Sequence, residues 1–415
     1  MSRSADEARL PVSLVIVSRG RPDALRRLLS ALQFQTHTSF ELIVVSDQPG
    51  LVTMALADQA RHQHFDEANI SAARNIGLRM ARGAVIAFCD DDAVPDPWWL
   101  DRLTAPFSDP NVGIAGGYVR GRNGISFQWK ATGTDICGDD LPLSVAGSEV
   151  VIATPQDGFF PRAHGTNCAF RTEALRGIGG FDEGFRFFLD ETDVCLRLGQ
   201  AGWAAAIVPR AQVHHGFAES AHRTAARVPR SFFDVGASKA LFLAKHGGTS
   251  SVSMDRLRGD RRAQLLELMR DGRLEPRDVP NLMDTLESGL ASQIDSQMPD
   301  TVAALDAAAL RPVVTLSPDR AIPILCTPRS LKLAIKAAQK IRDESGVPFV
   351  FSFSFTTLFH KRSYDERGFW MQSGGLFGRA DRQQPLMRFT TLRQRVRTEC
   401  ADLEGVFSFG PLVVV

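Results

Sequence analysis

Short apolar runs alternate with helical segments through the first hundred residues, and this alternation constrains the fold more than any other feature. The runs are residues 12–17, 40–47 and 84–89. They are rich in valine, isoleucine and leucine, as expected of strands buried on both faces of a parallel sheet. After Pro22, four leucines recur at the i, i+3, i+4 and i+7 positions of one helix face. This pattern predicts right-handed βαβ units and an open, mostly parallel sheet.

Two later segments extend the pattern. The spacing of residues 71–83 predicts a helix with Ser71 as its N-cap and Gly83 just past its end. Residues 189–203 have acidic side chains in the first turn of a predicted helix, where the helix dipole favours negative charge. A strand is predicted at 206–215, and it ends in two histidines.

Polar residues follow three of the predicted strands at the point where each strand ends. Ser18 and Arg19 follow the first strand, Asp47 ends the second, and the aspartates at 90–92 follow the third. Ligands of open α/β sheets bind outside the carboxyl ends of the strands. The sequence therefore predicts a ligand site at this edge of the sheet.

The three consecutive aspartates are the strongest chemical signal. Neighbouring carboxylates repel one another, and each raises the pKa of the next unless a cation lies between them. One interpretation is a solvated acidic turn. The other is a site for Mn²⁺ or Mg²⁺, held by Asp90 and Asp92 with Asp91 in support, which would neutralise a diphosphate leaving group.

Other candidate residues each have a structural and a functional interpretation. Asp47 is either a turn former or an acceptor of hydrogen bonds from a base or ribose. Arg74 is either a surface arginine of a helix or a phosphate clamp. Asp190 and its neighbours either cap a helix or place a general base across the pocket from the diphosphate. His215, or His214 on the opposite face of the strand, is either structural or a metal ligand, and strand alternation favours His215.

Length and charge narrow the possible functions. The 415 residues suffice for two or three domains, and a formal net charge of +1 argues against a nucleic-acid partner. None of the six cysteines has CxxC spacing, so we expect reduced thiols in a cytosolic protein. We expect neither a secretory signal nor a transmembrane segment, because no apolar run approaches the ~20 residues that span a bilayer.

The chain changes character twice after the strand at 206–215. Residues 250–300 are charged and helical in pattern. Apolar runs then return, and in 347–355 phenylalanines alternate with serines, which is the period of a half-buried strand. We predict three parts, namely 1–245, a helical connector at 246–310, and a smaller α/β region at 311–415.

The order of these motifs resembles that of the family 2 glycosyltransferases, whose nucleotide-binding fold is called GT-A. The resemblance covers about residues 11–216, and the matching stretches are VSLVIVSRGRPDALRRLLSAL, FELIVVSD, ANISAARNIGLRMARGAVIAFCDDDAVPDPWWL, GTNCAFRTEALRGIGGFDEGF and DETDVCLRLGQAGW. It implies an α/β, Rossmann-like GT-A domain over 1–245 that binds a nucleoside-diphosphate sugar. The acidic triplet corresponds to the DXD motif of that family.

The resemblance also implies roles for single residues. The nucleoside of the donor would contact Ser18, Arg19 and Asp47, and its diphosphate would meet Asp90 and Asp91. From its residue type and place alone, Arg74 is a further candidate to contact the donor phosphates. The metal, Mn²⁺ or Mg²⁺, would be held by Asp90, Asp92 and His215. The acid pair of the family is Glu-Asp, whereas this chain has Asp190 followed by Glu191, so Glu191 falls at the position of the general base and Asp190 is the alternative. Trp98 and Trp99 would either pack in the core or line the sugar pocket.

The implied function is metal-dependent transfer of a sugar to an acceptor hydroxyl, with inversion, in polysaccharide or glycoconjugate biosynthesis. The acceptor would be a saccharide or a lipid-linked molecule, and the protein would act in the cytoplasm or peripherally at the inner membrane surface. Oligomers are compatible with this function. A non-catalytic nucleotide-sugar-binding regulatory module and a metal-dependent phosphohydrolase remain as alternatives.

The region 311–415 has two interpretations of its own. It would bind an anionic acceptor or assemble subunits, or it is a small appendage whose arginines face water. The residues that would contact an anionic acceptor are His360, Lys361, Arg362 and Arg379.

Overall fold

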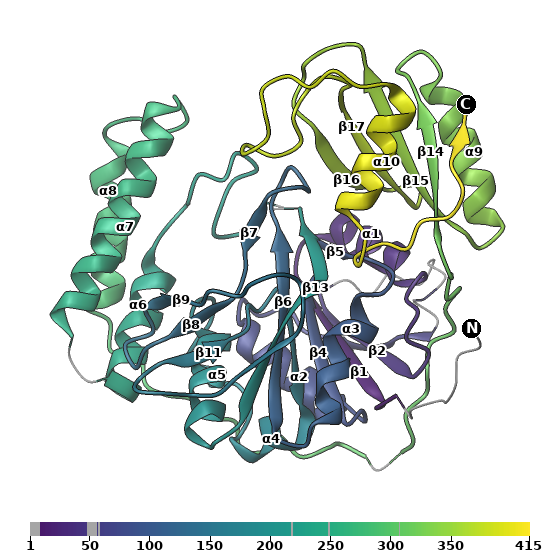
Figure 1. Cartoon of the computed structure of the whole chain (residues 1–415). Coiled ribbons are helices and arrows are strands. Elements are labelled where there is room, and N and C mark those ends of the chain that lie inside the picture. The colour runs from purple at the N-terminus through teal and green to yellow at the C-terminus, as the bar shows by residue number, and fades with distance from the viewer. Residues whose placement is uncertain (1–8, 48–55, 57–58, 217–218, 248–249, 307) are drawn as a thin grey trace.

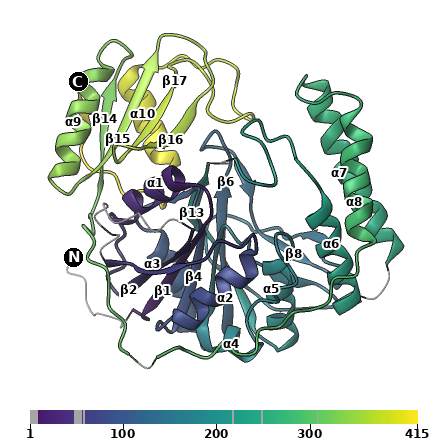
Figure 2. The same ribbon diagram turned by 180° about the vertical axis from the view of Figure 1, so that it is seen from behind.

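The structure is a computed structural model that describes residues 9–415 apart from 48–55, 57–58, 217–218, 248–249 and 307. Figure 1 shows a large sheet flanked by helices, a helical hairpin of α7 (Ser251–Arg270) and α8 (Asp278–Leu290) beside it, and a smaller C-terminal sheet at one end. Seen from behind in Figure 2, the same three parts keep this arrangement.

Parallel strands form the half of the large sheet that carries the predicted ligand edge. The elements of this half are β1 (Val12–Ser18), α1 (Pro22–Leu32), β2 (Phe40–Ser46), β3 (Arg61–His64), α2 (Ile70–Met80) and β4 (Val85–Asp90). Strand β1 lies between β2 and β4, and β2 pairs with β3, all in parallel. The alternation of apolar runs and helices has therefore produced the predicted βαβ arrangement.

The N-cap of α2 differs from the prediction. The cap is Asn69, whose side chain accepts a hydrogen bond from the Ala72 amide at 3.1 Å. The Ser71 hydroxyl instead donates to the Phe185 carbonyl at 2.6 Å. The prediction of Ser71 as the cap is wrong because a tertiary contact uses this hydroxyl.

The other half of the sheet is mixed. Its elements are β5 (Ala93–Pro95), α3 (Trp99–Thr104), the 3₁₀ helix η2 (Ala105–Ser108), β6 (Val112–Arg120), β7 (Phe127–Trp129), β10 (Val151–Ala153), β12 (Asn167–Arg171), α4 (Thr172–Gly177), α5 (Asp190–Gln200) and β13 (Ala204–His215). The strand order is β10-β13-β6-β12-β4-β1-β2-β3, with β5 on β13 and β7 on β6. Strand β12 runs antiparallel to both neighbours, whereas β13 and β6 are parallel. A separate small sheet contains β8 (Thr132–Thr134), β9 (Asp140–Pro142) and β11 (Phe160–Arg162).

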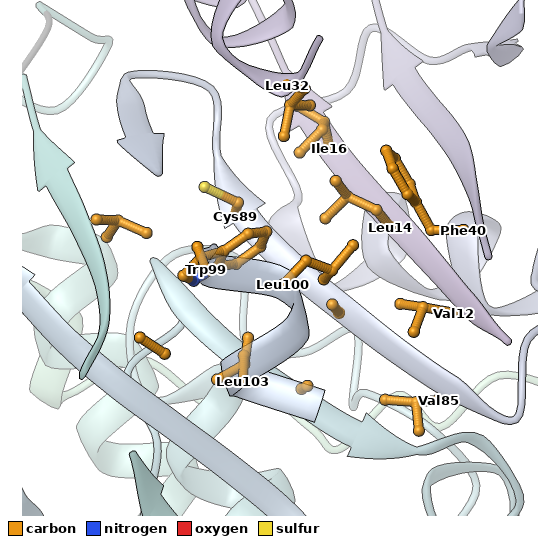
Figure 3. Packing of buried hydrophobic residues seen from close by; sticks show 14 of the residues in the cluster. Val12, Leu14, Ile16, Leu32, Phe40, Val85, Cys89, Trp99, Leu100 and Leu103 are labelled. Carbon is orange, nitrogen blue, oxygen red and sulfur yellow. The ribbon is translucent and has the colours of Figure 1, made fainter. Parts of the chain in front are cut away.

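Helices cover both faces of the large sheet, which confirms the α/β class. On one face lie α1 and α3, of which α3 contacts β13, β6 and β12. Figure 3 shows Trp99, Leu100 and Leu103 of α3 in one apolar cluster with residues of β1, β2 and β4. On the other face, α2, α4 and α5 enclose a second apolar cluster. Because helices cover both faces of the sheet, we expect a ligand to reach it at the carboxyl ends of the strands.

The helical part follows β13. It contains α6 (Phe233–Phe242), the π-helical turn η3 (Leu243–Gly247), α7 and α8, and it buries a small apolar cluster of its own. Residues 291–320 then run back along the large sheet, where the Leu305 amide donates to the Arg79 carbonyl and the Val313 amide to the Phe40 carbonyl. The helical part is thus tied to the large sheet at several points.

The C-terminal sheet packs on the large one. Its elements are β14 (Ala321–Cys326), α9 (Leu331–Asp343), β15 (Val347–Ser354), β16 (Lys361–Asp365), β17 (Phe369–Gly375), α10 (Leu392–Asp402) and β18 (Val413–Val414), with the strand order β16-β17-β15-β14-β18. One apolar cluster joins Phe349 and Trp370 of this sheet to Phe34 and to Val94 of β5. The C-terminal sheet therefore lies close to the carboxyl edge of the large sheet.

The structure also shows the state of the cysteines and the lengths of the helices. All six cysteines are free thiols. No helix in the described part of the chain is long and apolar enough to span a lipid bilayer.

Candidate active site

The register of the parallel strands brings the predicted site residues to one edge. Ser18 lies opposite Ser46 in β2, and Val17 lies opposite Asp90 in β4. Ser18, Asp47 and the aspartates at 90–92 thus leave three adjacent strands at the same level. The predicted convergence at the carboxyl edge is present in the structure.

Each aspartate of the triplet contacts a different partner. Asp90 Oδ2 accepts a hydrogen bond from the Thr166 hydroxyl at 2.6 Å. Asp91 is fully buried, and its Oδ2 accepts from the Ser18 hydroxyl at 2.6 Å. Asp92 Oδ1 lies 3.2 Å from His215 Nε2. The three carboxylates therefore have different hydrogen-bond or ion-pair partners, although they stay close enough to repel one another.

Two arginines that the sequence did not single out lie against the triplet. Arg21 lies 2.7 Å from Asp91 Oδ1 and 3.4 Å from Asp92 Oδ2. Arg223, from the loop after β13, lies 3.7 Å from Asp92 Oδ2. Burial raises the pKa of Asp91 to about 7, with the charge of Asp92 adding to the effect and Arg21 opposing it. Arg21 was within reach of sequence reasoning, since it lies in the same strand-end loop as Arg19.

Asp90, Asp92 and His215 form a group that fits a divalent cation. One ligand atom of each lies within 4.8 Å of the others. The pairing of β5 with β13 places His215 opposite Ala93, directly after the triplet. His215 Nδ1 lies 3.0 Å from Gln128 Oε1, so a hydrogen bond there leaves the lone pair of Nε2 facing Asp92. Two carboxylates and an oriented imidazole match the ligands that Mn²⁺ accepts.

His214 has a different environment from its neighbour. Its ring lies 4.5 Å from that of Trp370 in β17. Both ring nitrogens are buried, and neither has a hydrogen-bond partner among the residues that the structure describes. Burial lowers the pKa of His214 well below its usual value. Strand alternation thus turns His214 toward the C-terminal sheet and His215 toward the acidic triplet.

The acid pair begins α5 directly after a residue with unusual backbone geometry. Leu189 is buried and has φ of +66°, a left-handed conformation that costs free energy for a leucine. The strained residue sets the direction in which Asp190 and Glu191 enter the site. Positions of this kind occur preferentially at functional sites.

Arg74 connects the acid pair to the triplet. Its side chain is buried, forms an ion pair with Asp190, and lies 3.8 Å from Asp90 Oδ1. Glu191 Oε1 lies 3.8 Å from Arg162 Nη1, a residue of β11 that sequence reasoning missed. Arg74 therefore links Asp90 of the triplet to Asp190, the residue that precedes Glu191 in α5.

The two acids of the pair differ in their protonation. Burial raises the pKa of Asp190, and the charge of Glu191 adds to this although Arg74 opposes it. Burial acts on Glu191 too, but Arg162 and Arg74 outweigh it and lower the pKa of Glu191. The same surroundings therefore shift the pKa values of the two acids in opposite directions.

An aromatic side chain lies beside the metal-ligand group. The Trp129 ring is stacked on His164, with centroids 4.9 Å apart and an interplanar angle of 13°, and its centroid lies 5.9 Å from that of His215. Trp98 and Trp99 lie elsewhere. Trp99 is buried and donates its indole hydrogen to Asn167, and the Trp98 ring packs 6.0 Å from Phe407. Their positions match the core-packing interpretation.

A cavity of about 440 Å³ opens beside the triplet. Its lining residues are Arg19, Gly20, Arg21, Asp47, Glu219, Ser220 and Ala221. Asp47 Oδ2 accepts from the Gly20 amide at 2.9 Å, whereas Asp47 Oδ1 is buried with no hydrogen-bond partner among the described residues. A buried carboxylate oxygen without a partner is costly, so this cavity has the chemistry to receive a donor group from a ligand.

Comparisons of the sequence with known proteins give one family and several relatives. Residues 9–232 match the family described as "Glycosyltransferase like family 2". A pre-mycofactocin glycosyltransferase of Mycobacterium tuberculosis is 28% identical over 249 residues, which are 57% of this chain and 48% of that protein. The O-antigen biosynthesis protein RfbC of Myxococcus xanthus is 28% identical over 53% of this chain and 18% of its own length. The chain thus spans about half, or less, of the length of these relatives.

A third relative is more similar over a shorter stretch. The N-acetylglucosaminyl-diphospho-decaprenol L-rhamnosyltransferase of M. tuberculosis is 42% identical over 53 residues, which are 13% of this chain and 17% of that protein.

Two solved structures have weak similarity to the fold. GalNAc-T7 with UDP, GalNAc and Mn²⁺ has a TM-score of 0.41 and 20% identity, over 51% of this chain and 44% of that one. The mannosyltransferase PcManGT from Pyrobaculum calidifontis, with GDP-Man and Mn²⁺, has a TM-score of 0.41 and 18% identity, over 68% and 70% of the two chains. With TM-scores below 0.5, these two structures support no functional assignment.

Proposed function

The chain belongs to glycosyltransferase family 2, and from this premise we propose that it transfers a sugar from a nucleoside-diphosphate sugar to an acceptor hydroxyl, with a divalent metal and with inversion. One observation carries the proposal. Asp90, Asp92 and His215 form a metal-ligand group, and Arg74 links Asp90 to Asp190, which directly precedes the ionised Glu191. A phosphate-binding centre and a general base at one opening are what such a transfer needs.

The donor would occupy the cavity beside the triplet. Asp47 Oδ1 would accept a hydrogen bond from the base or ribose, and Ser18 and Arg19 would border the nucleoside. Arg21 and Arg223 lie where a diphosphate would approach Asp92, and their guanidinium groups would bind its oxygens. Arg74 would bridge Asp90 and Asp190, and so fix the position of both carboxylates next to the sugar of the donor.

Asp90, Asp92 and His215 would be the protein ligands of the metal ion. Asp91 would support them, since the Ser18 hydroxyl donates a hydrogen bond to its carboxylate. A bound Mn²⁺ or Mg²⁺ would neutralise the diphosphate as its bond to the sugar breaks. The hydrogen bond of Gln128 to His215 would fix the imidazole for this role.

Glu191 would take the proton of the acceptor hydroxyl. Its lowered pKa keeps it ionised at neutral pH, and its side chain is more exposed than that of Asp190, at 18% against 3%. Asp190 is engaged by Arg74 and would position the helix end. Glu191 is therefore our assignment of the base, with Asp190 as the alternative.

The acceptor would be a saccharide or a lipid-linked saccharide. The relative that acts on a diphospho-decaprenol acceptor, and the relative of O-antigen biosynthesis, support this class. We propose that the protein works in the cytoplasm at the inner membrane surface, in polysaccharide or glycoconjugate synthesis, and that residues 246–310 and 311–415 serve acceptor binding or assembly. The partly buried Trp129 ring would stack on one face of a saccharide.

The experiment is a panel of nucleotide sugars tested with and without Mn²⁺ on the wild type and on Asp92→Ala. The true donor should raise the melting temperature only when Mn²⁺ is present, since a ligand stabilises the state that binds it. Asp92→Ala should abolish this shift and lower transfer by about 10³-fold or more. The matched control is Glu173→Ala in α4, an exposed carboxylate far from the site.

The products decide between the candidate activities. A nucleoside diphosphate and a glycosylated acceptor support the transferase, and a nucleoside monophosphate indicates a phosphohydrolase. Donor binding with neither transfer nor hydrolysis would indicate a regulatory module. Turnover and metal binding that survive in Asp92→Ala would make the proposed metal site wrong.

A further inference from the structure

Two loops of the C-terminal sheet expose large apolar side chains. Loop 355–359 joins β15 to β16, and loop 376–391 joins β17 to α10. The side chains of Phe389, Leu386, Phe355 and Leu358 are 81%, 74%, 67% and 63% exposed. We call these four residues, together with Phe359 and Met387, the two-loop patch.

The two loops form one continuous surface. The Phe377 amide donates to the Thr356 carbonyl at 3.0 Å, and the Arg388 amide donates to the Phe377 carbonyl at 3.0 Å. The Phe377 and Phe389 rings lie 6.1 Å apart. Single exposed apolar residues are common on soluble proteins, but a cluster of six on two joined loops indicates an interaction surface.

The patch is surrounded by positive charge. Loop 376–391 contains three arginines and one acid, and Lys361 follows the other loop. The Arg379 guanidinium lies 5.3 Å from the centre of the Phe359 ring, and Arg382 and Arg388 are exposed. Since the whole chain has a formal net charge of only +1, the positive charge is a local property of this surface.

Apolar side chains set among arginines and lysines match an anionic lipid surface. The apolar groups enter the boundary between head groups and acyl chains while the cations stay at the level of the phosphates. A second copy of the chain fits less well, because a two-fold contact through this patch would bring the same arginines together.

The position of the patch agrees with this partner. Figures 1 and 2 both show the loop before α10 projecting from the C-terminal sheet on the side of the α7–α8 hairpin. The C-terminal sheet itself contacts the active site, because Trp370 packs on His214 and the Arg362 amide donates to the Asn123 carbonyl at 2.7 Å. A surface bound by the two loops would therefore be held in fixed relation to the metal-ligand group.

We propose that the two-loop patch docks the protein on an anionic lipid bilayer. A docked enzyme would meet a lipid-linked acceptor at the membrane surface, and this consequence rests on the proposed function. The docking itself depends only on the exposed apolar groups and their surrounding cations.

The experiment is co-sedimentation of the full chain with vesicles of phosphatidylcholine alone or with 30% phosphatidylglycerol. The wild type should bind the anionic vesicles, and the binding should weaken as salt is raised. The double variant Leu386→Ser/Phe389→Ser should bind at least about tenfold less, because each exposed apolar group contributes about that factor on burial. The matched control is Val252→Ser/Leu333→Ser, which removes apolar groups that are 69% and 58% exposed elsewhere.

Three outcomes would overturn the inference. In the first, the wild type does not bind anionic vesicles. In the second, Leu386→Ser/Phe389→Ser binds them as well as the control variant Val252→Ser/Leu333→Ser does. In the third, light scattering shows a dimer of the wild type that only Leu386→Ser/Phe389→Ser dissociates. The last outcome would assign the patch to self-association. Transfer to a soluble acceptor by the wild type is measured in parallel without vesicles, so failure of the docking and failure of the proposed transferase give different results.

Discussion

Two clusters of buried charge in this protein differ in one property. The C-terminal sheet buries a network of five residues, namely His360, Arg362, Gln372, Arg395 and Glu399. Gln372 donates to Glu399 at 2.8 Å, Arg395 Nε donates to Glu399 at 2.8 Å, and Arg362 donates to Gln372. None of these five has a buried side-chain nitrogen or oxygen without a partner.

At the carboxyl edge of the large sheet, the buried polar groups are not all satisfied by partners among the described residues. Asp47 has a buried oxygen with no hydrogen-bond partner within the described part of the chain. Burial raises the pKa of Asp91 to about 7, and Leu189 has a strained backbone. A network whose members satisfy one another is a structural core, whereas unmet partners and strain are found where a ligand completes the site. The comparison separates the two clusters although both are buried and charged.

The largest expected effect breaks the satisfied network. Glu399→Gln leaves the Arg395 charge buried without its counter-ion, so the free energy of unfolding should fall by about 3–5 kcal/mol. Transfer per folded molecule should be unchanged. Chemical denaturation measures the first and an activity assay the second. Glu366→Gln, which removes an exposed partner of Arg27, is the control and should change stability by less than about 0.5 kcal/mol.

The opposite result would reclassify the cluster. A Glu399→Gln variant with normal stability and impaired transfer would show that the C-terminal network takes part in the reaction.

Glu191→Gln tests the incomplete cluster. It should lower kcat by about 10²-fold or more, equivalent to about 2.7 kcal/mol, because the amide cannot take a proton. The melting-temperature shift caused by the donor with Mn²⁺ should persist, and stability should change little. Steady-state kinetics with Glu173→Gln as the control measure this. An unchanged kcat would move the base to Asp190 or elsewhere.

Asp193 sharpens the comparison, because it lies two residues after Glu191 but is fully paired. His246 Nε2, Arg197 Nη2 and Lys245 Nζ lie 2.7, 2.6 and 3.0 Å from its oxygens. Burial opposes ionisation, but these three groups outweigh it and lower the pKa of Asp193 from 3.8 to about 2. Asp193→Asn should therefore cost about 2 kcal/mol of stability at pH 7, with no direct effect on catalysis.

The pH dependence of this difference has a fixed sign. A carboxyl whose folded pKa is lowered stabilises the fold above its unfolded pKa of 3.8, and the stabilisation is lost as pH falls toward 2. The gap between wild type and Asp193→Asn in urea unfolding should thus be constant from pH 7 to about 5 and shrink below pH 4. A gap that stays constant at pH 3 would contradict the assignment.

The smallest expected effect concerns Trp129. Trp129→Ala should raise the KM of the saccharide that it contacts by about tenfold, with a smaller change in kcat, and Trp129→Phe should restore most of the loss. Trp98→Ala, which removes a ring packed on Phe407, should lower stability without this change in KM. Equal effects of the two alanine variants on KM would remove Trp129 from the site.

Part of the site could be predicted from local sequence. A strand followed by an acid places that acid at the end of the strand wherever the strand lies, so Asp47 and the triplet were predictable. Arg162, Arg223, Gln128 and Trp129 were not, since no local pattern distinguishes them from surface residues. They reach the site only because β11, β7 and the loop after β13 return to the same edge.

The sequence by itself determined the α/β class and the edge at which polar groups gather, because hydrophobic periodicity depends on neighbouring residues and acts before any long-range contact. The tertiary structure alone decided the rest. The register of β13 against β5 turned His215 toward Asp92 and His214 toward Trp370. Burial and nearby guanidinium groups shifted the pKa values of Asp190 and Glu191 in opposite directions, since these surroundings exist only in the folded chain.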